Sequence, residues 1–263
     1  MFDRLHQFAD LTRRLGPTHA VRRKLQDAWH HVAVPHAPYT LTTKAAQFPL
    51  WCRPGTTDAL VFWQVFIDQQ YAAFAPAAPP RLILDCGANV GYTAAYFLTR
   101  FPGARVIAVE PDPGNAALLR RNVAPYGARA TVYETAIWSW PVGLVFETTP
   151  FRSGGEWARQ MREARAGETP ALRAIDIPTL IAEAGDGRVS LLKMDIEGAE
   201  TVVFSAPCAW LARVDALMVE VHDDTAERTF ARAAGSRFAI HRHGELAVAV
   251  PTPAPGASSR ASG

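Results

Sequence analysis

The segment from Leu82 to Gly91 reads Leu-Ile-Leu-Asp-Cys-Gly-Ala-Asn-Val-Gly, an apolar run that ends in a carboxylate and passes at once into a glycine-containing turn. An uninterrupted apolar run of this kind is typical of a strand buried on both faces of a parallel sheet. Glycines let the backbone turn sharply and approach a ligand closely. Ligands of open α/β sheets bind beyond the carboxyl ends of the strands. We therefore expect a binding crevice lined by Asp85, Gly87, Asn89 and Gly91.

The rest of the chain alternates expected strands with expected helices. The strands are expected at 82–85, 105–109, 130–134, 189–194, 215–221, 237–241 and 246–250, and helices near 91–101, 113–124, 178–184, 197–205 and 224–233. This alternation favours an α/β fold, a Rossmann-like and mostly parallel seven-stranded sheet covered on both faces. The last two strands are joined by a short turn at His243-Gly244-Glu245, so the sheet is expected to end in a C-terminal antiparallel hairpin.

Length and composition indicate one main domain with extensions. The chain has 263 residues, 49% of them apolar, which is enough for one large core. We expect an N-terminal helical extension over 1–78, with an amphipathic helix over 58–74, then the main domain over 79–250. Residues 141–171 interrupt the alternation and are a candidate lid insert. The Pro-, Ala-, Ser- and Gly-rich tail over 251–263 is expected to be disordered.

Charge and hydropathy narrow the class of protein. No stretch approaches the roughly 18 consecutive apolar residues of a membrane span, and residues 1–24 lack the apolar run of a signal peptide, so we expect a cytoplasmic protein. Those 24 residues hold six basic and two acidic side chains, which we interpret as a solvated helix face. The segment lacks the interleaved aromatic residues of a nucleic-acid binder. Three widely spaced cysteines predict neither a disulfide framework nor a CxxC metal pair.

Acidic residues at the strand ends indicate which cofactor the crevice takes. Asp85 stands where a dinucleotide would place its pyrophosphate, and a carboxylate there repels phosphate and attracts an ammonium group. The turn reads GxNxG, whereas dinucleotide enzymes use GxGxxG. The second strand is followed by Glu110, which can accept the hydroxyls of a ribose. These features favour S-adenosylmethionine, with Ala136 and Ile137 beside its adenine.

The end of the fourth expected strand gathers the residues suited to chemistry. Asp195 follows this strand directly, where it could take a proton or hold a metal ion. Glu197 and Glu200 come at the start of the next helix, where the helix dipole alone favours acids. Lys193 is expected to pair with one of these acids in a structural role.

The fifth expected strand ends in Glu220 and His222, on the same rim as Asp195. His222 could act as a general base near neutral pH. Alternatively, Asp195 and Glu220 could hold a divalent cation such as magnesium between their oxygens. The sequence leaves both routes open.

Four motifs together resemble the FkbM family of S-adenosylmethionine-dependent methyltransferases. They are Asp85-Cys-Gly-Ala-Asn-Val-Gly91, Val109-Glu-Pro-Asp-Pro113, Lys193-Met-Asp-Ile-Glu-Gly-Ala-Glu200 and Val219-Glu-Val-His222, and the upstream segment Arg53–Phe62 is also similar. The resemblance covers about residues 50–250 and is more specific than any one motif. It implies a class I methyltransferase domain over 79–250. It also implies O-methylation of a hydroxyl on a sugar of a glycolipid or polysaccharide, or on a polyketide-type natural product.

Two other classes of protein remain open on the residues alone. A nicotinamide-dependent oxidoreductase needs the GxGxxG turn that this chain lacks. A non-catalytic nucleoside-binding protein would keep the pocket without the chemistry, and the three acids between Asp195 and Glu200 argue against it. The expected partner is a small-molecule or glycan hydroxyl acceptor, and the oligomeric state is left open.

Overall fold

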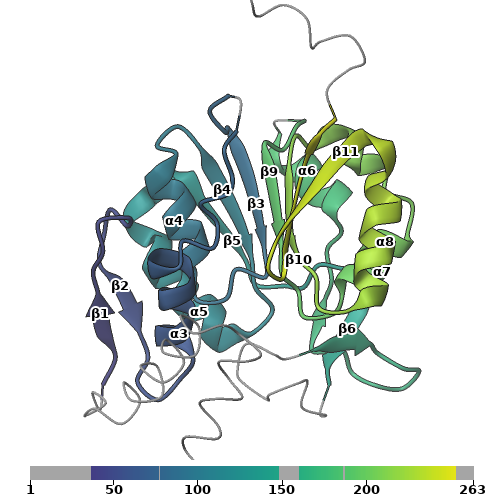
Figure 1. Cartoon of the computed structure of the whole chain (residues 1–263). Coiled ribbons are helices and arrows are strands. Elements are labelled where there is room, and N and C mark those ends of the chain that lie inside the picture. Colours follow the sequence, from purple (N-terminus) through teal and green to yellow (C-terminus); the bar gives the residue numbers. More distant parts are fainter. Residues whose placement is uncertain (1–36, 77, 148–159, 186, 253–263) are drawn as a thin grey trace, which may run out of the picture.

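A seven-stranded sheet with the strand order β11-β12-β10-β9-β3-β4-β5 forms the centre of the computed structural model (Figure 1). The model describes residues 37–76, 78–147, 160–185 and 187–252. The strands are β3 (Leu82–Cys86), β4 (Arg105–Val109), β5 (Ala130–Tyr133), β9 (Leu191–Met194), β10 (Leu217–Glu220), β11 (Phe238–His243) and β12 (Leu246–Pro251). The first five are parallel, whereas β12 pairs antiparallel with both β10 and β11. This confirms the predicted sheet and its C-terminal hairpin.

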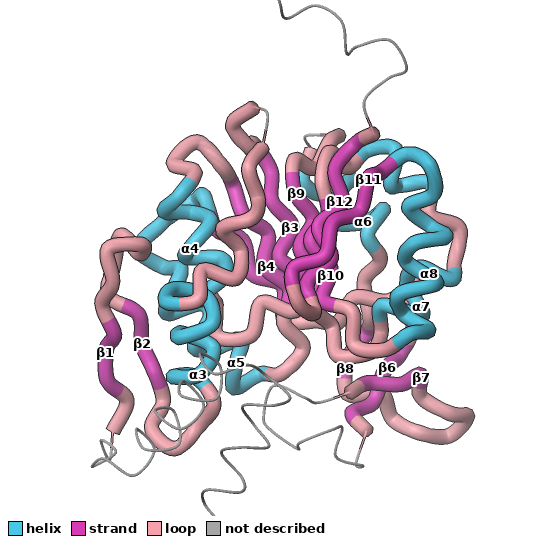
Figure 2. Tube along the Cα trace, in the orientation of Figure 1, coloured by secondary structure: helices cyan, strands magenta, loops and turns pink. Residues whose placement is uncertain are grey.

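Helices cover both faces of the sheet, which gives three layers (Figure 2). One face carries α3 (Asp58–Phe62), η1 (Trp63–Ile67), α4 (Tyr92–Arg100) and α5 (Pro113–Val123), and the other carries α6 (Ile177–Ala184), α7 (Glu200–Ser205) and α8 (Asp224–Ala234). Short 3-10 helices, η2 (Ala124–Arg129), η3 (Ala209–Arg213) and η4 (Gly235–Arg237), lead into strands. In the described parts of the chain, none of the helices combines the length and the apolar character needed to cross a membrane.

Aspartate side chains begin three of the helices near the carboxyl edge of the sheet. Asp112 accepts from the backbone of Gly114 and Asn115, and Asp176 and Asp223 cap α6 and α8 in the same way. Such caps satisfy backbone N–H groups that lack a partner within the helix. The caps thereby fix the short strand-to-helix loops that form the rim of the sheet.

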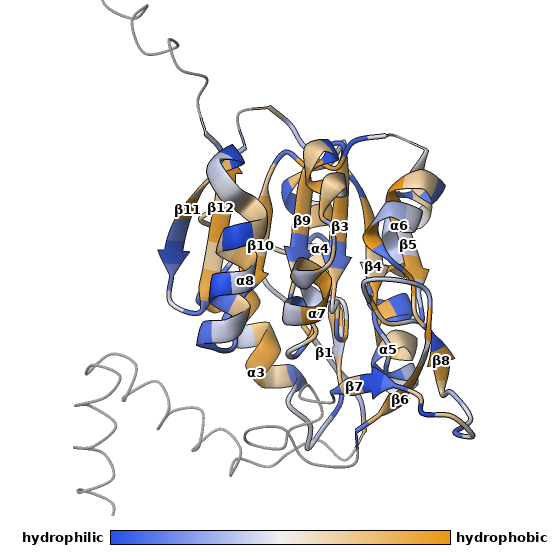
Figure 3. Ribbon diagram, turned by 90° about the vertical axis from the view of Figure 1, so that its right-hand side faces the viewer, coloured by the Kyte–Doolittle hydropathy of each residue, from blue (hydrophilic) through white to orange (hydrophobic). Residues whose placement is uncertain are grey.

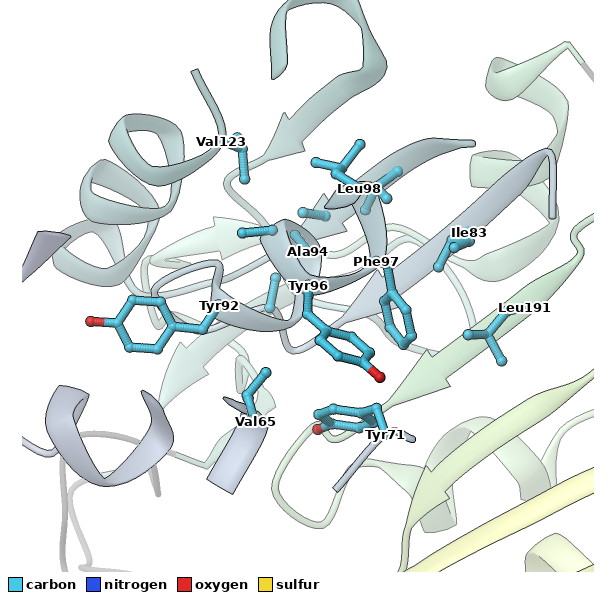
Figure 4. Close-up of a cluster of buried hydrophobic side chains, with 14 of the residues drawn as sticks. Val65, Tyr71, Ile83, Tyr92, Ala94, Tyr96, Phe97, Leu98, Val123 and Leu191 are labelled. Carbon is cyan, nitrogen blue, oxygen red and sulfur yellow. The ribbon is translucent and has the colours of Figure 1, made fainter. Parts of the chain in front are cut away.

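The alternation of side chains along the strands divides the core into two apolar clusters. Ile83 and Leu191 point to the face covered by α4, where Phe97 and Tyr71 pack (Figure 4). Leu84 and its neighbours of the same parity point to the face covered by α6, α7 and α8. The central strands β3 and β9 are apolar except for Asp85 and Lys193 near their carboxyl ends, whereas the edge strand β11 is hydrophilic toward its end (Figure 3). A polar edge strand discourages pairing with another chain.

Two small sheets were not predicted from the sequence. The antiparallel pair β1 (Tyr39–Leu41) and β2 (Leu50–Cys52) lies in the expected helical extension, of which residues 1–36 are outside the described residues. Strands β6 (Gly143–Phe146), β7 (Met161–Glu163) and β8 (Leu172–Arg173) form a three-stranded sheet beyond the carboxyl ends of the central strands (Figure 1). Residues 148–159 of the expected lid and 253–263 of the expected tail also lie outside the described residues.

The helix predicted over 58–74 is shorter and of mixed type. α3 ends at Phe62 and continues as a π-helical turn, η1, in which Asp68 N–H donates to the Trp63 carbonyl at 3.0 Å. Gln69 then adopts a left-handed backbone with φ of 52°, which ends the helix. Residues 70 and 71 are thereby directed back toward the sheet, where Tyr71 is buried.

Candidate functional site

A cavity of about 290 Å³ lies at the carboxyl ends of β3, β4, β9 and β10. Of the predicted site residues, those that line it are Gly87, Asn89, Glu110, Ala136, Ile137, Asp195, Glu220 and His222. They come from the carboxyl ends of five parallel strands and the loops that follow, the position where open α/β sheets bind their ligands. Asp85 and Gly91 do not line the cavity.

The turn after β3 needs its glycines for packing. Gly87 and Gly91 have φ values of +77° and +86°, and Asn89 is also left-handed at 49°. A Cβ at Gly87 would lie 1.7 Å from the backbone oxygen of Asp195, and one at Gly91 would lie 2.5 Å from Leu119 Cδ1. Gly87 therefore lets the turn meet the end of β9, and Gly91 lets α4 pack on α5.

Glu110 is a buried carboxylate in the cavity wall, only 6% exposed. Its oxygens accept from the backbone N–H groups of Asn89 and Asp112 and, at 3.4 Å, from the side chain of Asn115. Burial raises the pKa of Glu110 to about 7, although these donors oppose the shift. Asn115 also lines the cavity, and sequence reasoning missed it because nothing in the local pattern separates it from a helix surface residue.

Asp85 is fully buried beneath the turn and paired with Lys193. Lys193 Nζ lies 3.2 Å from Asp85 Oδ1 and 3.9 Å from Asp195 Oδ2, and it donates to the Gly87 carbonyl at 2.6 Å. Burial raises the pKa of Asp85, and the Lys193 charge opposes that shift. Asp85 does not line the cavity, and a direct contact between Asp85 and the ammonium group of a donor stays a prediction. Other acids, among them Asp195 and Glu220, do line the cavity.

His222 is surrounded by the three acids that follow β9. Its Nδ1 lies 3.5 Å from Glu200 Oε1, and its Nε2 lies 3.6 Å from Asp195 Oδ1 and 3.7 Å from Glu197 Oε2. Glu200 is fully buried and accepts from the backbone N–H groups of Ile196 and Gly198, so it holds the loop in shape. The dipole effect expected for Glu200 is therefore accompanied by a structural role in this loop.

The pKa values in this cluster indicate which side chain could accept a proton at neutral pH. Burial lowers the pKa of His222, but the hydrogen bond and charge of Glu200, together with the other acids, outweigh it and raise the pKa to about 9. Burial raises the pKa of Asp195, although the charges of Lys193 and His222 oppose this shift. The charge of Asp195 and burial raise the pKa of Glu220 to about 8. At neutral pH His222 therefore holds a proton, and Asp195 is the better proton acceptor.

The predicted magnesium site at Asp195 and Glu220 is not supported by the donor set. Among the described residues, the group of possible ligands whose atoms lie within 4.8 Å of one another is Asp195, Glu200 and His222. Both Glu200 oxygens already accept backbone N–H groups, and Glu220 accepts from Gln70 at 3.3 Å. Magnesium prefers oxygen ligands in near-ideal octahedral geometry. A set that contains His222 and a Glu200 carboxylate already hydrogen-bonded to the backbone does not offer this geometry.

The loop after β5 forms the apolar side of the cavity. Ala136, Ile137 and Trp138 are buried, and Ile137 forms a parallel bridge with Ile175. Trp138 Nε1 donates to Glu163 of β7 at 2.9 Å, which ties this loop to the small sheet. An apolar wall with fixed backbone suits the flat face of a nucleobase.

The remaining walls come from segments without a recognisable motif. Val61, Gln64 and Tyr71 line the cavity from the α3–η1 side, and Phe146 and Met161 line it from the small sheet. Sequence reasoning missed all of them. The helical pattern over 58–74 does not show where the helix ends, and β6–β8 do not show the alternation of apolar and polar residues that is typical of strands.

The sheet order, the glycine turn at β3 and the acidic cavity define a Rossmann-like class I S-adenosylmethionine-dependent methyltransferase domain. A family model described as the methyltransferase FkbM domain matches residues 85–246, more than half of the chain. The chain therefore belongs to this family, which confirms the resemblance seen in the motifs.

Two curated proteins to which the chain is similar are named as methyltransferases. The chain is 25% identical over 194 residues to the 31-O-demethyl-FK506 methyltransferase FkbM of Streptomyces tacrolimicus, covering 62% of this chain and 74% of that protein. It is 29% identical over 160 residues to the 2-O-methyltransferase NoeI of Sinorhizobium fredii, covering 55% and 65%. The solved structure of the mitomycin 7-O-methyltransferase MmcR has a TM-score of 0.42 at 12% identity, over 74% of this chain and 55% of that chain. The chain spans 10%, 48% and 62% of the length of three further curated relatives.

Proposed function

We propose that this chain is an S-adenosylmethionine-dependent O-methyltransferase whose acceptor is a small-molecule hydroxyl. The acceptor classes that we favour are a sugar of a glycolipid or polysaccharide and a polyketide-type natural product. The observation that carries the proposal is one cavity in which Glu110, Asp195, Glu220 and His222 meet at the strand ends. The names of FkbM and NoeI, which are O-methyltransferases, support it.

The charge of the cavity suits a positively charged donor. Among the described residues that line it, six carboxylates outnumber two basic side chains: Glu110, Asp112, Asp195, Glu197, Glu220 and Glu245 against Lys193 and His222. Glu110 and Glu220, with pKa values raised to about 7 and about 8, carry only part of their charge at neutral pH. An excess of carboxylates over basic groups still favours a sulfonium and an ammonium over phosphate. When bound, the donor supplies a methyl group on an already activated sulfonium.

The residues that would hold the donor lie along one side of the cavity. Glu110 would accept the ribose hydroxyls, the turn at Gly87 and Asn89 would pass beside the amino-acid part, and Ala136 and Ile137 would contact the adenine. This assignment uses residues that the cavity already brings together.

The chain's own contribution to the chemistry is alignment and removal of a proton. A sugar hydroxyl is a weak acid, so its proton must go to a base as the new bond forms. Asp195 is that base in our proposal, because it lines the cavity and burial raises its pKa. Lys193 and His222 lie within 3.9 Å of its oxygens and stabilise its ionised form.

The alternatives from the sequence are less well supported. A nicotinamide-dependent oxidoreductase does not agree with membership of a methyltransferase family. A non-catalytic nucleoside-binding protein would not need the buried Glu200 that organises Asp195 and His222. Methylation itself separates this last class from the proposal.

The test is mass spectrometry of cell extracts and glycan, lipid and polyketide fractions incubated with methyl-labelled S-adenosylmethionine. We expect a labelled product with the wild type and a loss of about 100-fold or more with Asp195→Asn, since a general base contributes about 10²–10⁴-fold. Calorimetry with S-adenosylhomocysteine should show that Asp195→Asn still binds the nucleoside. Unlabelled fractions throughout would favour the non-catalytic binder, and full turnover by Asp195→Asn would exclude Asp195 as the base.

A further inference from the structure

We propose that Lys193 is a positioning residue for the methyl donor, because it holds the donor-binding turn at Gly87 and cancels the charge of Asp85. This inference rests on the proposed function. Lys193 is on the central strand β9 and is only 2% exposed. An ammonium group in such a place is costly unless it is paired and hydrogen-bonded. The partners of Lys193 therefore indicate its role.

The sheet register brings Lys193 and Asp85 together. Asp85 of β3 stands directly opposite Lys193 of β9 in the parallel pairing, so both side chains point to the same face. Ile83 and Leu191, two residues earlier on each strand, show that this is the face beneath Phe97 and Tyr71 (Figure 4). The ion pair is thus a fixed consequence of strand alignment.

Lys193 completes a clamp on the turn after β3. Its Nζ donates to the Gly87 carbonyl at 2.6 Å, and the N–H groups of Gly87 and Ala88 both donate to the Val109 carbonyl at 2.9 Å. On the β9 side, Asp195 N–H donates to the Cys86 carbonyl at 3.0 Å. The turn is therefore held by β4 on one side and by β9 on the other. Lys193 contributes a side chain to this clamp from β9, and Glu110, which accepts from Asn89 N–H, contributes one from the β4 side.

The Lys193 ammonium also affects the two nearby carboxylates differently. Lys193 lies nearer to Asp85 than to Asp195, at 3.2 Å against 3.9 Å. Asp85 is sealed and neutralised, whereas Asp195 lines the cavity. Loss of Lys193 would remove the tether on Gly87 and leave Asp85 as a buried charge without its counter-ion. A merely structural Lys193 would contribute only the second effect.

Three variants separate the two effects: Lys193→Met, Asp85→Asn and the double variant Asp85→Asn/Lys193→Met. The double variant has no buried charge at this pair, so it should regain the melting temperature that Lys193→Met loses. It still lacks the ammonium donor to Gly87. The probe is S-adenosylhomocysteine, titrated by calorimetry. A second readout is the hydrogen exchange rate of the Gly87 amide, followed by NMR with ¹⁵N-glycine labelling.

We expect Lys193→Met and the double variant to bind S-adenosylhomocysteine about tenfold or more weakly than the wild type, in line with one charge-assisted hydrogen bond. Asp85→Asn should weaken binding less, and the Gly87 amide should exchange faster only where Lys193 is absent. Val214→Ala, in the core at the opposite end of the sheet, is the stability control and should lower the melting temperature without changing affinity.

Wild-type affinity and slow Gly87 exchange in the double variant would overturn the inference, because charge compensation would then be the whole role of Lys193. An Asp85→Asn variant that binds as weakly as the double variant would also contradict it. No binding of S-adenosylhomocysteine by the wild type would instead refute the proposed function, and the inference with it.

Discussion

Single residues of the cavity have pKa values that differ from those of exposed side chains, and this gives the site a defined pH dependence. Burial raises the pKa of Glu110 to about 7, so this carboxylate gains or loses its proton near neutral pH. The acids around His222 raise its pKa to about 9, so it remains protonated at neutral pH. The two groups predict opposite changes as the pH rises.

Glu110 should make donor binding depend on pH around neutrality. Above about pH 7 its carboxylate is ionised and accepts ribose hydroxyls more strongly, so the affinity for S-adenosylhomocysteine should rise through this range. Glu110→Gln should bind more weakly at pH 8 and lack the component centred near pH 7. Calorimetry from pH 6 to pH 8.5 measures both, and an unchanged pH profile in the variant would contradict the role of Glu110.

His222 should stabilise the fold at neutral pH and cease to do so in alkali. Its pKa is raised from 6.5 to about 9, so its contribution is fully present below about pH 6.5 and is lost as the pH rises through about 9. The melting temperature of the wild type should therefore exceed that of His222→Gln at pH 6, and the gap should close above pH 9. A gap that widens with pH would show that the sign is wrong.

At the scale of elements, the turn between β3 and α4 depends on close backbone packing. Gly87→Ala would place a Cβ 1.7 Å from the Asp195 backbone oxygen at a φ of +77°, so we expect it to lose donor binding and to lower the melting temperature by several degrees. Gly103→Ala is the matched control, since a Cβ there meets nothing within 4 Å. Equal behaviour of the two variants in calorimetry and thermal melts would contradict the packing argument.

Some helices and strands were predicted correctly from the sequence, and others were not. The β3 and β4 strands were predicted because an uninterrupted apolar run is a strong local signal. The helix over 58–74 was mispredicted because the π-helical turn at Trp63–Ile67 and the left-handed Gln69 leave no mark in the apolar pattern. The β6–β8 sheet was missed for a similar reason, since its strands are short and carry no alternation.

Across the whole molecule, the alternation of strands and helices was enough to predict the sheet. The positions of the strand ends were enough to place the cavity. The local sequence could not show which acidic side chains face the cavity. Asp85 looks accessible in the sequence, yet Lys193, far later in the chain, is its register partner and neutralises it. The walls from Val61–Tyr71 and the β6–β8 sheet are also long-range, and the acceptor is expected to depend on them.

In our proposal, the cavity prefers a cationic amino-acid nucleoside to a phosphate-bearing dinucleotide. The most direct measurement is calorimetric titration of the purified protein with S-adenosylhomocysteine, S-adenosylmethionine and NADH under the same conditions. We predict binding heat with both adenosyl compounds and none with NADH. Tight binding of NADH, together with no heat from either adenosyl compound, would contradict the account.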